Sequence, residues 1–136
     1  MTFPNKTAPT GAQDAFNRVW DFFVVQKNSH SFIDTRCLYR TRKHGVSISG
    51  CGVGCMMPDD MAIQADQQRE SGIGSVLSNM PVVVEWFSMV PPIFLTRLQR
   101  AHDVTAGMTT SAQTTTIESV LRILAGEYGL NIPVVA

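Results

Sequence analysis

Three cysteines and one histidine are the first candidates for chemistry in this chain of 136 residues. Cys37, His44, Cys51 and Cys55 follow one another with the spacing C-x6-H-x6-C-x3-C. A structural zinc site uses four nitrogen or sulfur ligands, usually presented as close pairs such as C-x2–4-C. Only Cys51 and Cys55 form such a pair, and His44 falls in a predicted turn away from it. Zinc is therefore the less favoured interpretation. We expect no metal and no cofactor, with Cys37 and Cys51 as buried structural thiols that face each other.

Nucleophilic catalysis would need a thiol or hydroxyl beside a base that a third group orients. The parts occur in this sequence as the three cysteines, His30, His44, His102, Asp34 and Asp103. No G-x-S-x-G, P-loop or dinucleotide-binding glycine pattern accompanies them. His102 and Asp103 end a predicted helix, where a cation also interacts favourably with the helix dipole. An enzyme that depends on a thiol or a metal is the weakest alternative, and no catalytic residue is predicted.

A cluster of positive charge lies in the middle of the first half of the chain. Four of the 11 basic residues fall within eight positions, and an aromatic residue and a histidine adjoin them. The cluster consists of Arg36, Tyr39, Arg40, Arg42, Lys43 and His44. Such a group is suited to binding phosphate, a nucleic-acid backbone or an acidic surface of a protein. The alternatives are a solvated hairpin, or internal pairing with Asp59 and Asp60. Trp86 is a further candidate contact, because tryptophan is enriched at protein interfaces.

The composition limits these possibilities. The 11 basic residues balance 11 acidic ones, so the formal net charge is zero, and 44% of the residues are hydrophobic. This mixture excludes intrinsic disorder, and it excludes a protein that coats nucleic acid through an overall positive field. Absence of net charge also makes homo-oligomerisation possible. The zero total conceals a basic segment, residues 36–44, followed by an acidic one, residues 59–70.

The predicted helices and strands that position these residues indicate one small α+β domain over 12–136. A flexible lead-in over 1–11 precedes it. Apolar residues with helical spacing predict an amphipathic helix over 12–26. Short β-prone runs over 32–40 and 46–49 predict a β-hairpin, whose turn contains Gly45.

Two or three packed helices are expected to follow the hairpin and a glycine-rich connection. Residues 82–87 fit either a strand or a helix. Pro91-Pro92 is typical of a helix start, and that helix should continue to Asp103. A capping box at Thr115-x-x-Glu118 predicts where the last helix begins, and Gly129 is suited to its end.

Three segments of the sequence are considered as a set: residues 37–60, 95–103 and 124–130. The first contains Cys37-Leu-Tyr-Arg40 and Cys51-Gly-Val-Gly-Cys-Met-Met-Pro-Asp-Asp60. It resembles the pattern C-x-Y-R, a short turn, then C-x-V-G-x-[LM]-[IM]-P-[DE]-[DE] of a family of small uncharacterised bacteriophage and prophage proteins. Residues 95–103 are similar to the family's L-x-R-L-Q-x-x-H-D segment, and residues 124–130 to its C-terminal helix. The resemblance implies a phage setting and no particular chemistry.

These observations favour a small non-enzymatic accessory protein that binds a host or phage macromolecule, such as an inhibitor of a host defence or metabolic protein. A module that binds a nucleotide or nucleic acid through the basic cluster is the alternative. No targeting signal and no run of apolar residues long enough to span a bilayer is visible in the sequence. We therefore expect no membrane partner and a cytoplasmic location in an infected bacterial host.

Overall fold

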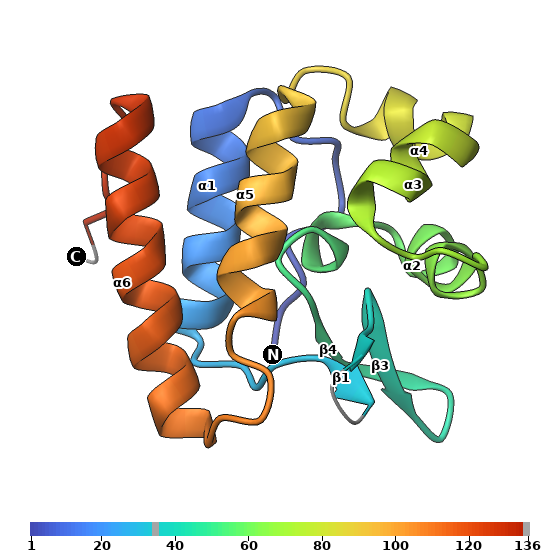
Figure 1. Cartoon of the computed structure of the whole chain (residues 1–136), viewed down its shortest axis with the longest axis horizontal. Helices are drawn as coiled ribbons and strands as arrows, with labels where there is room; N and C mark the ends of the chain where they lie inside the picture. The colour runs from blue at the N-terminus through green and yellow to red at the C-terminus, as the bar shows by residue number, and fades with distance from the viewer. Residues whose placement is uncertain (34–35, 135–136) are drawn as a thin grey trace.

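The computed structural model describes residues 1–33 and 36–134, and it confirms a small α+β domain. An N-terminal helix precedes a β-hairpin, and several packed helices follow it (Figure 1). Five α-helices follow the hairpin in the described part of the chain, where the sequence indicated two or three. The additional helices are short, and apolar periodicity is weak over so few residues.

Three helices lie side by side and form the larger layer of the domain (Figure 1). They are α1 (Ala12–Trp20), α5 (Pro92–Asp103) and α6 (Thr110–Tyr128). A turn of π-helix, η1 (Asp21–Val25), extends α1 along the same path. Each helix turns an apolar stripe toward the others, and Phe16, Leu98 and Leu121 are completely buried between them.

The strands form two small antiparallel pairs beside this layer. β1 (Phe32–Ile33) pairs with β2 (Arg36–Cys37), and β3 (Arg40–Lys43) pairs with β4 (Val46–Gly50). The β3–β4 turn contains only His44 and Gly45, with φ angles of 52° and 77°. Two positive φ angles in succession are typical of the tight turn that matches the twist of a hairpin. A hairpin before the helices is confirmed, but its first strand is β3 rather than the whole of 32–40, and its turn is shorter than expected.

The glycine-rich connection packs closely against its neighbours and ends in a short 3-10 helix, η2 (Gly54–Met56). A Cβ atom on Gly54 would lie 2.1 Å from the backbone oxygen of Tyr39, and one on Gly52 would lie 2.2 Å from that of Leu98. Only glycine allows both approaches. The connection is therefore fixed between the hairpin and α5.

Three short helices follow the connection and form the second, smaller group in Figure 1. They are α2 (Asp59–Asp66), α3 (Ile73–Asn79) and α4 (Pro81–Trp86). The ambiguous segment 82–87 is thus mainly helical, with Pro81 at the first position of α4. Proline is favourable there because the first N–H groups of a helix have no partner within it.

The predicted start of the last helix is wrong by six residues, because its N-cap is Thr109 and not Thr115. α6 begins at Thr110, and the hydroxyl of Thr109 accepts a hydrogen bond from the backbone N–H of Ala112. Thr115 lies inside the helix, where its hydroxyl donates to the carbonyl oxygen of Ser111. The predicted end is confirmed, because Gly129 adopts φ 63° directly after Tyr128.

The first eleven residues, predicted as a flexible lead-in, lie against the domain. The ring of Phe3 packs 5.1 Å from that of Phe22, and Asn5 donates to the carbonyl oxygen of Met57. In the described residues, no helix is both long enough and apolar enough to cross a membrane.

Candidate functional site

The structure divides the basic cluster of the sequence into two parts. Arg36, Arg42, Lys43 and His44 are exposed, whereas Tyr39 and Arg40 are buried, with 1% and 3% of their surfaces accessible. Tyr39 and Arg40 therefore do not belong to the exposed surface of the hairpin, where the sequence analysis placed them. Both residues lie at the base of the hairpin, where it packs against α2 and the glycine-rich connection.

Arg40 is held by the internal pairing that the sequence left as an alternative. Its guanidinium forms a salt bridge with Asp59. It also donates to the carbonyl oxygens of Gly54 and Met57 at 2.9 and 2.8 Å. The Phe3 ring covers it, with its centroid 4.1 Å from the guanidinium carbon. Arg40 therefore joins the hairpin, the connection and the N-terminal segment.

Tyr39 anchors the same base. Its hydroxyl donates to the carbonyl oxygen of Ser71 at 2.6 Å, and its backbone N–H donates to the Asp66 carboxylate at 2.7 Å. Burial raises the pKa of the Tyr39 hydroxyl, so that group remains a neutral donor. Trp86 is half-buried, and its indole N–H donates to the carbonyl oxygen of Met56 at 2.9 Å. Its hydrogen-bonding group therefore has a partner inside the protein.

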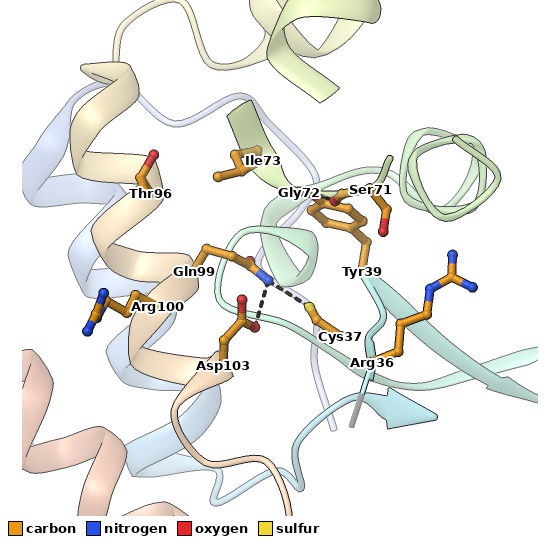
Figure 2. Close-up of a pocket in the computed structure, with 10 residues that line it drawn as sticks. All are labelled: Arg36, Cys37, Tyr39, Ser71, Gly72, Ile73, Thr96, Gln99, Arg100 and Asp103. Atoms are coloured by element: carbon orange, nitrogen blue, oxygen red, sulfur yellow. Dashed lines mark hydrogen bonds between the residues drawn. The ribbon is translucent and has the colours of Figure 1, made fainter. Parts of the chain in front are cut away.

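A second group of side chains surrounds two of the cysteines, and we call it the thiol cluster. It consists of Cys37, Cys51, Gln99, His102 and Asp103. Cys37 comes from β2, Cys51 follows β4, and the other three lie on the last two turns of α5. A pocket of about 280 Å³ opens over it, with Cys37, Gln99 and Asp103 in its wall (Figure 2).

The Gln99 amide connects the two thiols. Its Nε2 donates to Cys37 Sγ at 2.7 Å, and its Oε1 accepts from Cys51 Sγ at 2.9 Å. The backbone N–H of Val53 also donates to Oε1, at 3.1 Å, which fixes the orientation of the amide. Nε2 donates to Asp103 Oδ1 as well, at 3.1 Å (Figure 2). One amide thus determines where both sulfur atoms lie.

His102 is a buried neutral imidazole whose two nitrogens have defined roles. Its Nε2 accepts the backbone N–H of Ser31 at 2.9 Å. The ring proton is therefore on Nδ1, which donates to Asp103 Oδ1 at 3.0 Å. Desolvation lowers the pKa of His102 and outweighs the effect of Asp103, so the ring stays uncharged at neutral pH. The ring also stacks on Phe32, with centroids 4.5 Å apart.

These contacts limit what the thiol cluster can do as a metal site. Cys37, His102 and Asp103 place their ligand atoms within 4.8 Å of one another. A metal on Nδ1 of His102 would require the proton on Nε2, which would then point at the N–H of Ser31. Metal-bound histidines instead donate from the other nitrogen to an acceptor. The zinc set considered from the sequence is not assembled either, because His44 is exposed at the turn and Cys55 is completely buried.

The same contacts prevent His102 from acting as a base toward the Cys37 thiol. His102 Nδ1 lies 4.0 Å from Cys37 Sγ, but it carries a proton and cannot accept another from the thiol. Cys51 within hydrogen-bonding reach, burial and Asp103 all raise the pKa of the Cys37 thiol. Of the other residues considered for catalysis, His30 contacts Phe32 and His102 by its ring, and Asp34 lies outside the described residues.

Sequence reasoning did not single out Gln99, and it placed His102 and Asp103 only at a helix end. A signal was present. Leu95, Leu98, Gln99 and His102 have the spacing i, i+3, i+4, i+7, so two polar residues continue an apolar stripe. Polar side chains on a buried face need partners, and the cysteines of the two other segments supply them.

Segments 37–60 and 95–103, singled out together in the sequence, meet at this cluster through Cys37, Cys51 and residues 99–103. No protein-family model, no curated protein and no solved structure matches this chain in comparisons with known proteins. Function is therefore inferred from the chain's own residues.

Proposed function

We propose that this chain is a small non-enzymatic binding protein whose hairpin tip contacts an acidic surface of a host or phage protein. The hairpin tip is defined here as residues 42–48, the turn with the strand ends that flank it. The resemblance to phage proteins makes proteins of an infected bacterium the first partners to test.

The observation that supports this proposal is the exposure of the cations at the tip. Arg42, Lys43 and His44 are exposed, and none of them forms an ion pair within residues 1–33 and 36–134. Arg42 donates to the carbonyl oxygen of Gly45 at 2.8 Å, which holds its guanidinium beside the turn. The tip thus presents positive charge from a short, defined loop, and such a surface favours an acidic partner.

The residues beside the cations favour a protein over a nucleic acid. Val46 and Ile48 are 63% and 43% exposed, although both are large and apolar. Val46 pairs with Lys43 across the hairpin, and Ile48 lies where β4 carries one residue more than β3. Apolar side chains next to cations suit a protein surface. A phosphate backbone would gain nothing from them, and Tyr39 is too deeply buried to stack on a base.

The test is a charge reversal at the tip, R42E with K43E, matched by K6E with R69E, which removes the same charge elsewhere on the exposed surface. Tagged proteins are used to capture partners from infected cells, and affinities are then measured with the purified partner. We expect the tip variant to weaken binding at least tenfold and the matched variant to retain it. Equal binding by both variants would contradict the proposal.

The salt dependence of binding distinguishes a nucleic-acid partner from a protein partner. The wild-type protein is titrated with a labelled duplex and a labelled single strand at several salt concentrations. Phosphate binding weakens steeply with salt, with a slope of about 0.9 per neutralised phosphate on duplex DNA. Tight binding with such a slope, lost in the tip variant, would replace the protein partner by a nucleic acid.

A further inference from the structure

Two thiols in the thiol cluster bind opposite ends of one side-chain amide, and this arrangement has no role in the binding function proposed above. Cys37 Sγ accepts from the nitrogen of Gln99 and Cys51 Sγ donates to its oxygen, at 2.7 and 2.9 Å. Both sulfur atoms therefore contact the end of one side chain, and Cys51 is the largest cause of the raised pKa of Cys37.

The two thiols differ in their access to solvent. Cys37 is partly exposed and forms part of the wall of the pocket, which is large enough, at about 280 Å³, for part of a small molecule to enter (Figure 2). Cys51 is completely buried behind it. A reagent in the pocket therefore meets Cys37 first, and Cys51 can be reached only through Cys37.

We propose that Cys37 and Cys51 form a redox-active dithiol, which a low-molecular-weight disulfide entering the pocket oxidises to an intramolecular disulfide. The Cys37 sulfur, after losing its proton, attacks one sulfur of the reagent; the reagent's S–S bond breaks and one thiol leaves. Cys51 then attacks Cys37 in the mixed disulfide, and the second thiol leaves. The two cysteines lose two protons and two electrons, and the reagent disulfide takes up both electrons and two protons to become two thiols.

Oxidation changes the structure at the base of the hairpin. The backbone N–H of Cys51 donates to the carbonyl oxygen of Tyr39 at 3.4 Å, directly after the pair of Gly50 with Arg40. Forming a disulfide removes the S–H group that Cys51 donates to Gln99 Oε1 at 2.9 Å, and it imposes a narrowly defined geometry on the two cysteines. Oxidation therefore changes the contacts by which Gln99 joins the base of the hairpin to α5.

The reaction should accelerate with pH. The attacking species is the thiolate, and the pKa of Cys37 is raised by its neighbours and by burial. Below that pKa the thiolate fraction grows tenfold per pH unit, so the rate should rise about tenfold from pH 7 to 8 and again from 8 to 9.

The experiment incubates the folded full-length protein with excess oxidised glutathione, alkylates the remaining thiols and maps the products by mass spectrometry. We expect the wild-type protein to lose two hydrogens through a Cys37–Cys51 bond, and a reducing agent to restore it. C51S should stop at a glutathione adduct on Cys37, C37S should not react at Cys51, and C55S should behave like the wild type.

Three results would overturn the inference. They are a wild-type protein that stops at the adduct on Cys37, a Cys51 that reacts as fast in C37S as in the wild type, and a reaction that occurs only in denaturant. Thermal melting checks that each variant is folded, and the product map of the wild-type protein decides the matter even where a variant does not fold. Because this experiment measures no partner binding, its outcome is independent of the proposed function.

Discussion

Two arginines of one strand have opposite environments. Arg40 begins β3 with a completely buried side chain, and Arg42, two residues later, is exposed at the other end of the same strand. The two residues point to the same side of an ideal strand. They differ because Asp59, Asp66 and the carbonyl groups of the glycine-rich connection surround the base of the hairpin, whereas nothing in the described residues packs against its tip.

The difference shows that a run of positive charge is not one functional unit. At the base, Arg40 donates to backbone carbonyl oxygens and pairs with one carboxylate. Its guanidinium is therefore unavailable to a partner. The tip keeps its cations in solvent together with two exposed apolar residues. The local dipole of the sequence, basic over 36–44 and acidic over 59–70, is thus partly cancelled inside the fold and partly retained on its surface.

The largest expected effect separates the two arginines directly. R40M removes the buried guanidinium that donates to the carbonyl oxygens of Gly54 and Met57, and each hydrogen bond from a charged group contributes about 1.5–3 kcal/mol to the unfolding free energy. R42M, the same substitution at the tip, should change stability by less than about 0.5 kcal/mol. Urea denaturation of both variants measures the two values. A similar loss in both would show that base and tip are equally structural.

Stability against pH gives the next effect, which is at most about 1.4 kcal/mol per pH unit for the buried His102. Desolvation lowers the pKa of His102 below 6.5, and it lowers that of His30 likewise, with His102 adding to the effect. The unfolded chain therefore binds more protons than the folded one below pH 6.5. Stability should be fully present above pH 6.5 and fall as the pH drops below it.

Denaturation at several pH values tests this profile in three proteins. H102Q removes one of the two histidines at the base and should flatten the fall below pH 6.5, whatever its effect on stability at pH 7. H44Q changes a histidine at the exposed tip and should leave the wild-type profile unchanged. A profile that responds to H44Q and not to H102Q would reverse the assignment of the two regions.

Sequence reasoning succeeded where the signal is local. Pro91-Pro92 marked the start of α5, Gly129 marked the end of α6, and Gly45 marked the turn of the hairpin, because each has a backbone requirement of its own. It failed where the deciding partner is distant. Arg40 meets Asp59 across 19 positions and Gln99 meets Cys37 across 62, and no local pattern reports such contacts. Sequence reasoning therefore treated residues 36–44 as one binding site, although they belong to two regions with different environments.

The smallest effect concerns the turn itself. His44 has φ 52°, a conformation that asparagine adopts more readily than histidine, and the first position of such turns favours asparagine. H44N should therefore stabilise the protein, by no more than about 0.5 kcal/mol. Thermal melting detects a change of this size in a small domain, and a loss of stability would contradict the assigned turn.

The H44N variant also shows whether His44 contributes only to the turn or contacts the partner as well. If H44N stabilises the hairpin and the captured partner binds as before, His44 is only a turn residue, and the contact is made by Arg42, Lys43 and their apolar neighbours. If stability rises while binding falls, the histidine ring itself touches the partner. A residue poorly suited to its turn would then be retained for the interaction, since unfavourable backbone conformations are kept where function requires them.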